Sequence, residues 1–263
     1  MRKFTRLLIM EWQTTLQYRA DLIMWVIMET ASPLVSLAIW YTIASSANSG
    51  PTPKETLTYY LLMFFIIICT SAWNGFFLSQ EILNGTISQY LIRPVSVFSK
   101  HIANNLTEKI IKLLIPLPIF IITLALAPHW FSETIYKPLN IAIFIVSLLL
   151  GATLSFIIDL NFGLLAFWLE DVTQIRRYND LLREITSGIL IPFAFLPLWA
   201  HNLFSFLPFR YIYSAPAEII LEQAKGIEVI QLLGVQAIYL LLATGLLTLL
   251  WRQGIKTYVP VGN

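Results

Sequence analysis

Residues 57–79 read LTYYLLMFFIIICTSAWNGFFLS, an apolar stretch that contains no Asp, Glu, Lys or Arg. Coiled as an α-helix that rises 1.5 Å per residue, this stretch would extend about 34 Å. The hydrocarbon core of a bilayer is about 30 Å thick. The stretch therefore predicts a transmembrane helix, and it is the clearest one in the chain.

The composition of the whole chain agrees with a membrane protein. Charged residues make up 12% of the 263 residues, against roughly 25% in a typical soluble domain. Hydrophobic residues make up 57%, and the mean hydropathy is +0.71. A soluble fold of this length could not hide so much apolar surface. We expect a single all-α membrane domain over residues 1–263, and the net charge of +2 gives no indication of a nucleic-acid partner.

Five further stretches are apolar enough to be transmembrane spans: 22–44, 110–127, 139–168, 187–200 and 229–251. The stretch 187–200 is short and contains Pro192 and Pro197. Lys and Arg are enriched in cytoplasmic loops of membrane proteins. With both termini in the cytoplasm, 13 of the 17 Lys and Arg lie inside, and the exceptions are Lys54, Lys137, Arg210 and Lys225. The sequence thus predicts six transmembrane helices with both termini cytoplasmic.

Two segments outside these spans are predicted to lie at the membrane surface. Residues 2–20 place Phe4, Leu8, Trp12 and Leu16 at intervals of four, as in an amphipathic helix that lies in the interface plane. The alternative is that this segment is the irregular start of the first span. Residues 201–227 are rich in aromatic residues and prolines but too short to cross a bilayer twice, which indicates a re-entrant helical pair on the outer side.

The sequence contains no recognisable catalytic motif. It lacks the G-x-x-x-x-G-K-[ST] phosphate loop, the H-E-x-x-H zinc motif and the G-x-S-x-G nucleophile motif. His101, His129 and His201 are scattered among predicted loops without the spacing of metal ligands. We therefore expect no catalytic residue, no metal site and no cofactor in this chain.

The connection after the second span, residues 81–105, reads EILNGTISQYLIRPVSVFSKHIANN. Gly85 permits a sharp turn, and Pro94 ends a helix and disfavours helical angles at Arg93. Apolar residues between them recur at helical spacing, which predicts a short helix across the cytoplasmic face. The residues alone leave open whether it is an interfacial loop or docks a partner.

Charged and polar residues within or beside the predicted spans form a second group of interest. Arg176, Asp180 and Arg183 share one face of an amphipathic segment, which could be a solvated surface helix or the inner mouth of a translocation path. Glu29 lies in the first span, and Asp159 and Asn161 lie in the fourth. Such groups are costly in a bilayer and often functional, although a structural hydrogen bond between helices is an equal alternative.

The pattern E-x-x-x-G-T-x-x-x-x-L-x-R-P, which starts at Glu81, resembles that of membrane permease subunits of ATP-binding-cassette (ABC) exporters of the ABC-2 type. The resemblance continues in FGLLAFWLEDV (162–172), LPFRYIYSAPAEIILEQ (207–223) and WRQGIKTYVPVG (251–262). It covers essentially the whole chain and is strongest for the branch of small permeases of about this length. The polar start of the fifth span departs from the family pattern.

The resemblance implies an interfacial elbow helix, six spans and an outer re-entrant pair. It also implies two copies of a separate ATPase that carry ATP and Mg, and a second permease that is identical or paralogous. The ATPase would dock on a coupling helix, a role that falls on Glu81, Gly85, Tyr90, Leu91, Arg93 and Pro94. Such a protein would lie among the lipids of a bacterial cytoplasmic (inner) membrane. Two alternatives are a membrane enzyme for a lipid-linked substrate and an ion-driven secondary transporter that uses Glu29 and Asp159.

Overall fold

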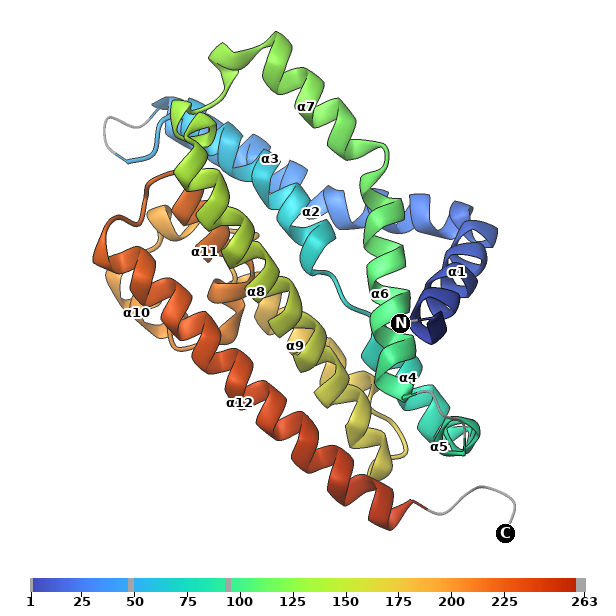
Figure 1. Ribbon diagram of the computed structural model, residues 1–263. Coiled ribbons are helices and arrows are strands. Elements are labelled where there is room, and N and C mark those ends of the chain that lie inside the picture. Colours follow the sequence, from blue (N-terminus) through green and yellow to red (C-terminus); the bar gives the residue numbers. More distant parts are fainter. Residues whose placement is uncertain (1, 47–49, 93–95, 259–263) are drawn as a thin grey trace.

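The computed structural model describes residues 2–46, 50–92 and 96–258, and within these ranges it consists of helices and connections without β-strands (Figure 1). The α-helices are α1 (Arg2–Gln17), α2 (Arg19–Ser46), α3 (Pro53–Thr70), α4 (Asn74–Leu83), α5 (Ser88–Leu91), α6 (Val97–Leu113), α7 (Pro116–Leu126), α8 (Pro138–Leu164), α9 (Thr173–Thr186), α10 (Leu198–Phe204), α11 (Pro208–Ile220) and α12 (Ile227–Thr257). Four short 3-10 helices are η1 (Pro128–Trp130), η2 (Glu133–Tyr136), η3 (Leu165–Phe167) and η4 (Phe193–Phe195).

Four helical stretches are long and apolar enough to cross a membrane: Ala20–Ser46, Pro53–Leu83, Pro138–Phe167 and Ile227–Thr257. They correspond to the predicted first, second, fourth and sixth spans. A fifth candidate is the pair α6 and α7, which are bent by 42° relative to each other. The prediction of an all-α, multi-pass membrane protein is confirmed, with four to five such spans among the described residues.

The prediction that residues 187–200 form a fifth transmembrane helix was wrong. This segment contains only the 3-10 turn η4 and the first residues of α10. Gly188 has φ +92°, a left-handed conformation that ends α9. Pro192 and Pro197 then interrupt any continuing ladder of helical hydrogen bonds.

The irregular segment is stabilised by side chains from the neighbouring spans. The carbonyl of Leu190 accepts hydrogen bonds from Trp40 Nε1 at 2.8 Å and from the Tyr60 hydroxyl at 3.1 Å. The carbonyl of Gly188 accepts one from the Tyr59 hydroxyl at 2.9 Å. Non-helical backbone is tolerated inside a membrane protein where such donors replace the missing helical bonds.

The predicted third span, 110–127, begins too late. The helix starts at Val97, so that Lys100, Lys109 and Lys112 belong to α6 and not to a loop. It breaks at Leu114 because Pro116 starts a new helix, α7, in which no residue is buried. The first half of α6 is polar, so a prediction based on hydrophobicity did not include it in the span.

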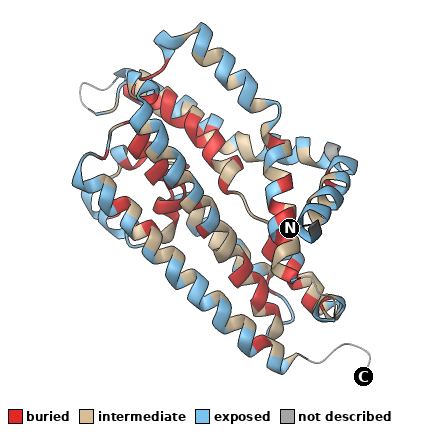
Figure 2. Ribbon diagram, viewed as in Figure 1, coloured by how far each residue is buried: buried red, intermediate tan, exposed pale blue. Residues whose placement is uncertain are grey.

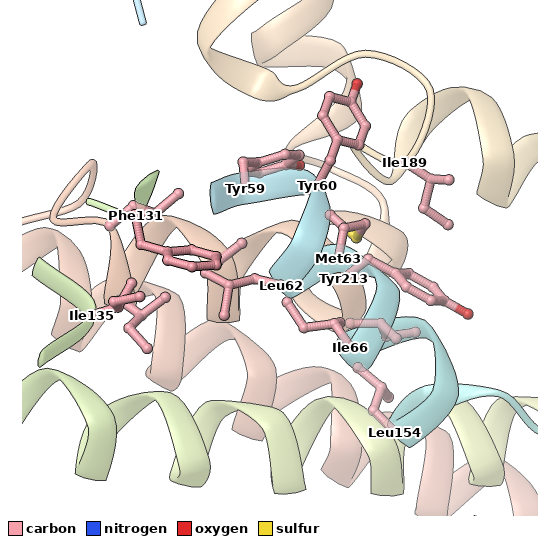
Figure 3. Close-up of a cluster of buried hydrophobic side chains, with 14 residues drawn as sticks. Tyr59, Tyr60, Leu62, Met63, Ile66, Phe131, Ile135, Leu154, Ile189 and Tyr213 are labelled. Atoms are coloured by element: carbon pink, nitrogen blue, oxygen red, sulfur yellow. The ribbon is translucent and has the colours of Figure 1, made fainter. Parts of the chain in front are cut away.

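The core lies around α3 and α11. Figure 3 shows Tyr59, Met63 and Ile66 of α3 packed with Leu154 of α8 and Tyr213 of α11. The helix α11 is buried from residue 211 to residue 220, whereas α7 and much of α12 carry exposed residues on the outside (Figure 2). Apolar outer faces over a partly polar interior are what lipid surroundings favour.

The segment predicted as the outer re-entrant pair folds as the end of α10, then α11, then the turn into α12. Within it, Arg210 Nη2 and Glu218 Oε2 form a buried ion pair at 2.8 Å. That this pair re-enters a membrane stays a prediction.

The predicted interfacial segment 2–20 contains α1, which packs against α6. Asn104 Nδ2 of α6 donates to Glu11 Oε2 of α1 at 2.9 Å. The start of α1 and the end of α12 both lie toward the end of the bundle that carries α5 (Figure 1). The interfacial position of α1 and the cytoplasmic side of the termini stay predictions.

Candidate functional site

The helix α9 is amphipathic in the opposite sense to a surface helix of a soluble protein. Its apolar residues Tyr178, Leu181 and Leu182 are exposed, whereas Arg176 and Arg183 are partly buried on the inward face. A solvated surface helix would bury the apolar face and expose the charges. The packing therefore favours the interpretation in which this charged face lines an interior space.

That interior space consists of two neighbouring cavities. The larger one, of ≈ 90 Å³, lies between α2, α9 and the gap between α3 and α4, and the smaller one, of ≈ 20 Å³, adjoins it beside α8. Arg176, Asp180 and Arg183 line both cavities; Glu29 lines the larger and Asp159 the smaller. The structure thus brings together five of the six residues that the sequence singled out for a translocation path.

Asp159 joins α8 to two other elements. Its Oδ1 lies 2.7 Å from Arg176 Nη1 of α9, and its Oδ2 accepts the backbone N–H of Gly75 at 2.6 Å. Gly75 lies in the first turn of α4, where unpaired N–H groups and the helix dipole favour a carboxylate. The carboxylate of Asp159 therefore holds three helices together at the wall of the cavities.

The second span is broken at this point, because α3 ends at Thr70 and α4 begins at Asn74. Side-chain amides occupy the break: Asn105 Nδ2 donates to the carbonyl of Ser71 at 3.4 Å, and Asn74 Nδ2 donates to that of His101 at 3.2 Å. A broken helix at membrane depth is tolerated where it lines a cavity or is covered by protein. Ser71, Ala72 and Trp73 do line the larger cavity.

Glu29 has a partner that the sequence could not name. Its Oε1 accepts from Lys112 Nζ of α6 at 3.0 Å, and Lys112 also contacts Glu108 at 2.7 Å, one turn earlier. The Lys112 side chain is 1% exposed. One buried ammonium is therefore shared by two carboxylates.

Asn161 is placed elsewhere. Its Nδ2 donates to the carbonyl of Ala243 at 3.0 Å and thereby links α8 to α12. It lines neither cavity. For this residue the structure supports the alternative of a hydrogen bond between helices.

The predicted coupling segment begins at the end of α4 and includes α5. Gly85 makes the turn with φ +73°, and its carbonyl accepts from the Tyr258 hydroxyl at 3.0 Å. Glu81 pairs with Lys100 and lies 3.3 Å from His101 Nε2. Arg93 and Pro94 lie outside the described residues.

The tip of this segment is apolar and exposed. Leu91 is 44% exposed and Ile92 is 86% exposed, whereas Lys100 Nζ lies 5.0 Å from the centre of the Tyr90 ring. The base of the segment is therefore held by polar contacts, and the apolar side chains of Leu91 and Ile92 at its tip are exposed.

Sequence reasoning missed the residues of α6 that support both sites. Lys112 was counted with the cytoplasmic connection 80–112, His101 was placed in a loop and Glu108 was not considered, whereas all three lie on α6. The i,i+4 spacing of Glu108 and Lys112 is a signal for a helix that could have been used. The gap between α3 and α4 was also missed, although Asn74 and Gly75 interrupt the apolar run there.

The described residues contain no group of three or more His, Cys, Asp or Glu placed to hold a metal ion. Span-length apolar helices, one of them broken beside a charged cavity, define a polytopic membrane protein. The chain belongs to the ABC-2 family of transporter proteins, because the family model described as "ABC-2 family transporter protein" matches residues 27–262. It is therefore a membrane permease component of an ABC transporter, as the resemblance implied. No curated protein and no solved structure matches the chain.

Proposed function

We propose that this permease pairs with a second permease, identical or paralogous, and that two separate ABC ATPase subunits drive export of a substrate past the charged cavity. The observation that carries this proposal is the inward charged face of α9, which lines both cavities. The family supports an ABC transporter, and the direction and the bacterial cytoplasmic membrane follow from the resemblance. ATP and Mg would be bound by the ATPase, and this chain would contribute no catalytic residue.

The cavity supports this role because its charges lie where apolar helices surround them. Charged side chains within membrane proteins usually face protein or a polar pathway. Arg176 and Asp180 lie between the broken second span and α2, two elements with built-in breaks or kinks, since α2 contains Pro33. Rigid-body movement of one permease against the other would open and close such a space.

The segment from Glu81 to Ile92 is suited to receive the movement of the ATPase. The Tyr258 hydroxyl connects Gly85 to the end of α12, and the ion pair between Glu81 and Lys100 connects α4 to α6. Movement of the exposed tip would therefore be transmitted to α4, α6 and α12. Arg93 and Pro94 would complete the docking surface.

Docking is tested by replacing the exposed tip. Ile92→Ser removes an apolar side chain from the proposed interface, and we expect tenfold or greater loss of the ABC ATPase that co-purifies with the tagged permease. The matched control is Leu198→Ser, since Leu198 is 76% exposed on α10. Equal recovery of the ATPase with wild type and Ile92→Ser would contradict the proposed docking site, provided both variants are inserted in the membrane.

A further inference from the structure

Two side-chain oxygens on the wall of the larger cavity have no hydrogen-bond partner among the described residues, whereas Arg176 Nη1, on the same wall, has Asp159 Oδ1 at 2.7 Å. Glu29 and Ser32 lie one turn apart on α2 and both line the cavity. Glu29 Oε2 and the Ser32 hydroxyl are buried and make no hydrogen bond within the described part of the chain. Buried oxygens are nearly always hydrogen-bonded, so these atoms indicate an occupant that donates hydrogen bonds.

The charges around the cavities are unbalanced. Three cationic side chains and five carboxyl groups belong to this cluster: Arg176, Arg183 and Lys112 against Glu29, Glu108, Asp159, Asp180 and Glu184. Lys112 is shared by Glu29 and Glu108, and adding Lys109 from the same helix still leaves one carboxyl group in excess. A positively charged occupant would balance the cluster.

The walls of the cavity suit an organic cation. Trp73 lines it, and the face of an indole ring attracts ammonium groups. The lining favours a metal ion less, because the described residues contain no group of three His, Cys, Asp or Glu placed as metal ligands. The volume of ≈ 90 Å³ has room for a small polar head group and not for a large molecule.

The cavity also reaches the apolar exterior. Met28 of α2 lines it and is 63% exposed. The rest of a bound molecule would therefore extend beside apolar side chains, where the lipid lies. An amphipathic amine has both of the required parts.

We propose that this cavity binds the ammonium group of an amphipathic amine. Glu29 Oε2 and the Ser32 hydroxyl accept its N–H groups, Trp73 packs on the cation, and the alkyl part leaves past Met28. This inference rests on the proposed function, because it assigns a substrate class to the cavity placed on the translocation path.

Binding is tested with the purified permease in nanodiscs of phosphatidylcholine. The probes are octylammonium, octyl sulfate and octanol, which share one alkyl chain and differ in the charge of the head group. The readout is the apparent melting temperature as each probe is titrated. We expect octylammonium to stabilise the wild type at concentrations at least tenfold lower than octanol, and octyl sulfate to give no stabilisation.

Two variants and a control locate the site. Glu29→Gln keeps the shape and leaves Lys112 paired with Glu108, and we expect it to weaken octylammonium binding about tenfold or more, as for the loss of a charge-assisted hydrogen bond. Ser32→Ala should weaken it about two- to tenfold. Glu170→Gln, at an exposed acid outside the cavity, should change nothing.

Stabilisation of the wild type by octylammonium, octyl sulfate and octanol at the same concentrations would overturn the proposal. Unchanged octylammonium affinity in Glu29→Gln would also overturn it. If Glu29→Gln does not fold, Ser32→Ala decides, because unchanged affinity in that variant contradicts the site. Co-purification of the ABC ATPase is measured on the same samples. Loss of ammonium selectivity with the ATPase still bound would reject the substrate class alone, whereas absence of the ATPase would reject the proposed function.

Discussion

Gly75 and Gly163 allow α4 and α8 to approach closely beside the charged cavity. A Cβ atom added at Gly75 would lie 1.9 Å from the backbone oxygen of Asp159, and one added at Gly163 would lie 2.5 Å from that of Gly75. Small residues permit this backbone contact in membrane bundles. The contact brings the N–H of Gly75 within 2.6 Å of the Asp159 carboxylate, which in turn pairs with Arg176.

Gly75→Ala is therefore expected to destabilise the permease severely. The new methyl group meets backbone that cannot give way without separating α4 from α8, a cost of about 1–3 kcal/mol or more for overpacking. The measurement is thermal unfolding in nanodiscs. The control is Gly234→Ala on α12, where a Cβ would meet nothing within 4 Å. Equal melting temperatures for the two variants would contradict the close contact.

At the scale of elements, α9 shows the limit of sequence reasoning. Its two faces were predictable from the spacing of Arg176, Asp180 and Arg183, but which face turns inward depends on surroundings that one helix does not encode. The charged face turns inward because Asp159 of α8 pairs with Arg176 there. The apolar face then lies outside, which is stable only in lipid or against another apolar surface.

Neighbouring positions on α9 should accordingly report opposite environments. With Cys69→Ser as background, spin labels are attached at Asp180→Cys and Leu181→Cys. We expect the label at 181 to be the more accessible to oxygen and the label at 180 to be the more accessible to a water-soluble nickel chelate. The reverse order would mean that α9 presents its charges outward, and the cavity would lose one wall.

Long uniform elements were predictable, and interrupted ones were not. The predicted spans 22–44, 139–168 and 229–251 correspond to α2, α8 and α12. Each is a long apolar run, so its approximate length could be read from the sequence. The segment 187–200 is also apolar, but it is held as irregular backbone by Trp40, Tyr59 and Tyr60 from other helices. Likewise, Glu29 was recognisable as a buried acid, whereas its partner Lys112 lies 83 residues away on a helix with a polar first half.

At the scale of the whole molecule, the described residues form a charged cavity beside α9 and, away from it, an exposed apolar tip at Leu91 and Ile92. The walls formed by α2 and α9 carry exposed apolar residues on their outer faces. Ile92, at the tip of the coupling segment, is 86% exposed. Membership of the ABC-2 family implies association with ABC ATPase components, and the second permease is part of the proposed function.

Native mass spectrometry of the tagged permease, extracted with its partners and kept with bound lipid, tests this account most directly. We expect a complex of two permease chains and two ABC ATPase chains, in which the two permeases are identical or paralogous. A single permease chain that carries no ATPase, and that transports in liposomes under an ion gradient alone, would contradict it.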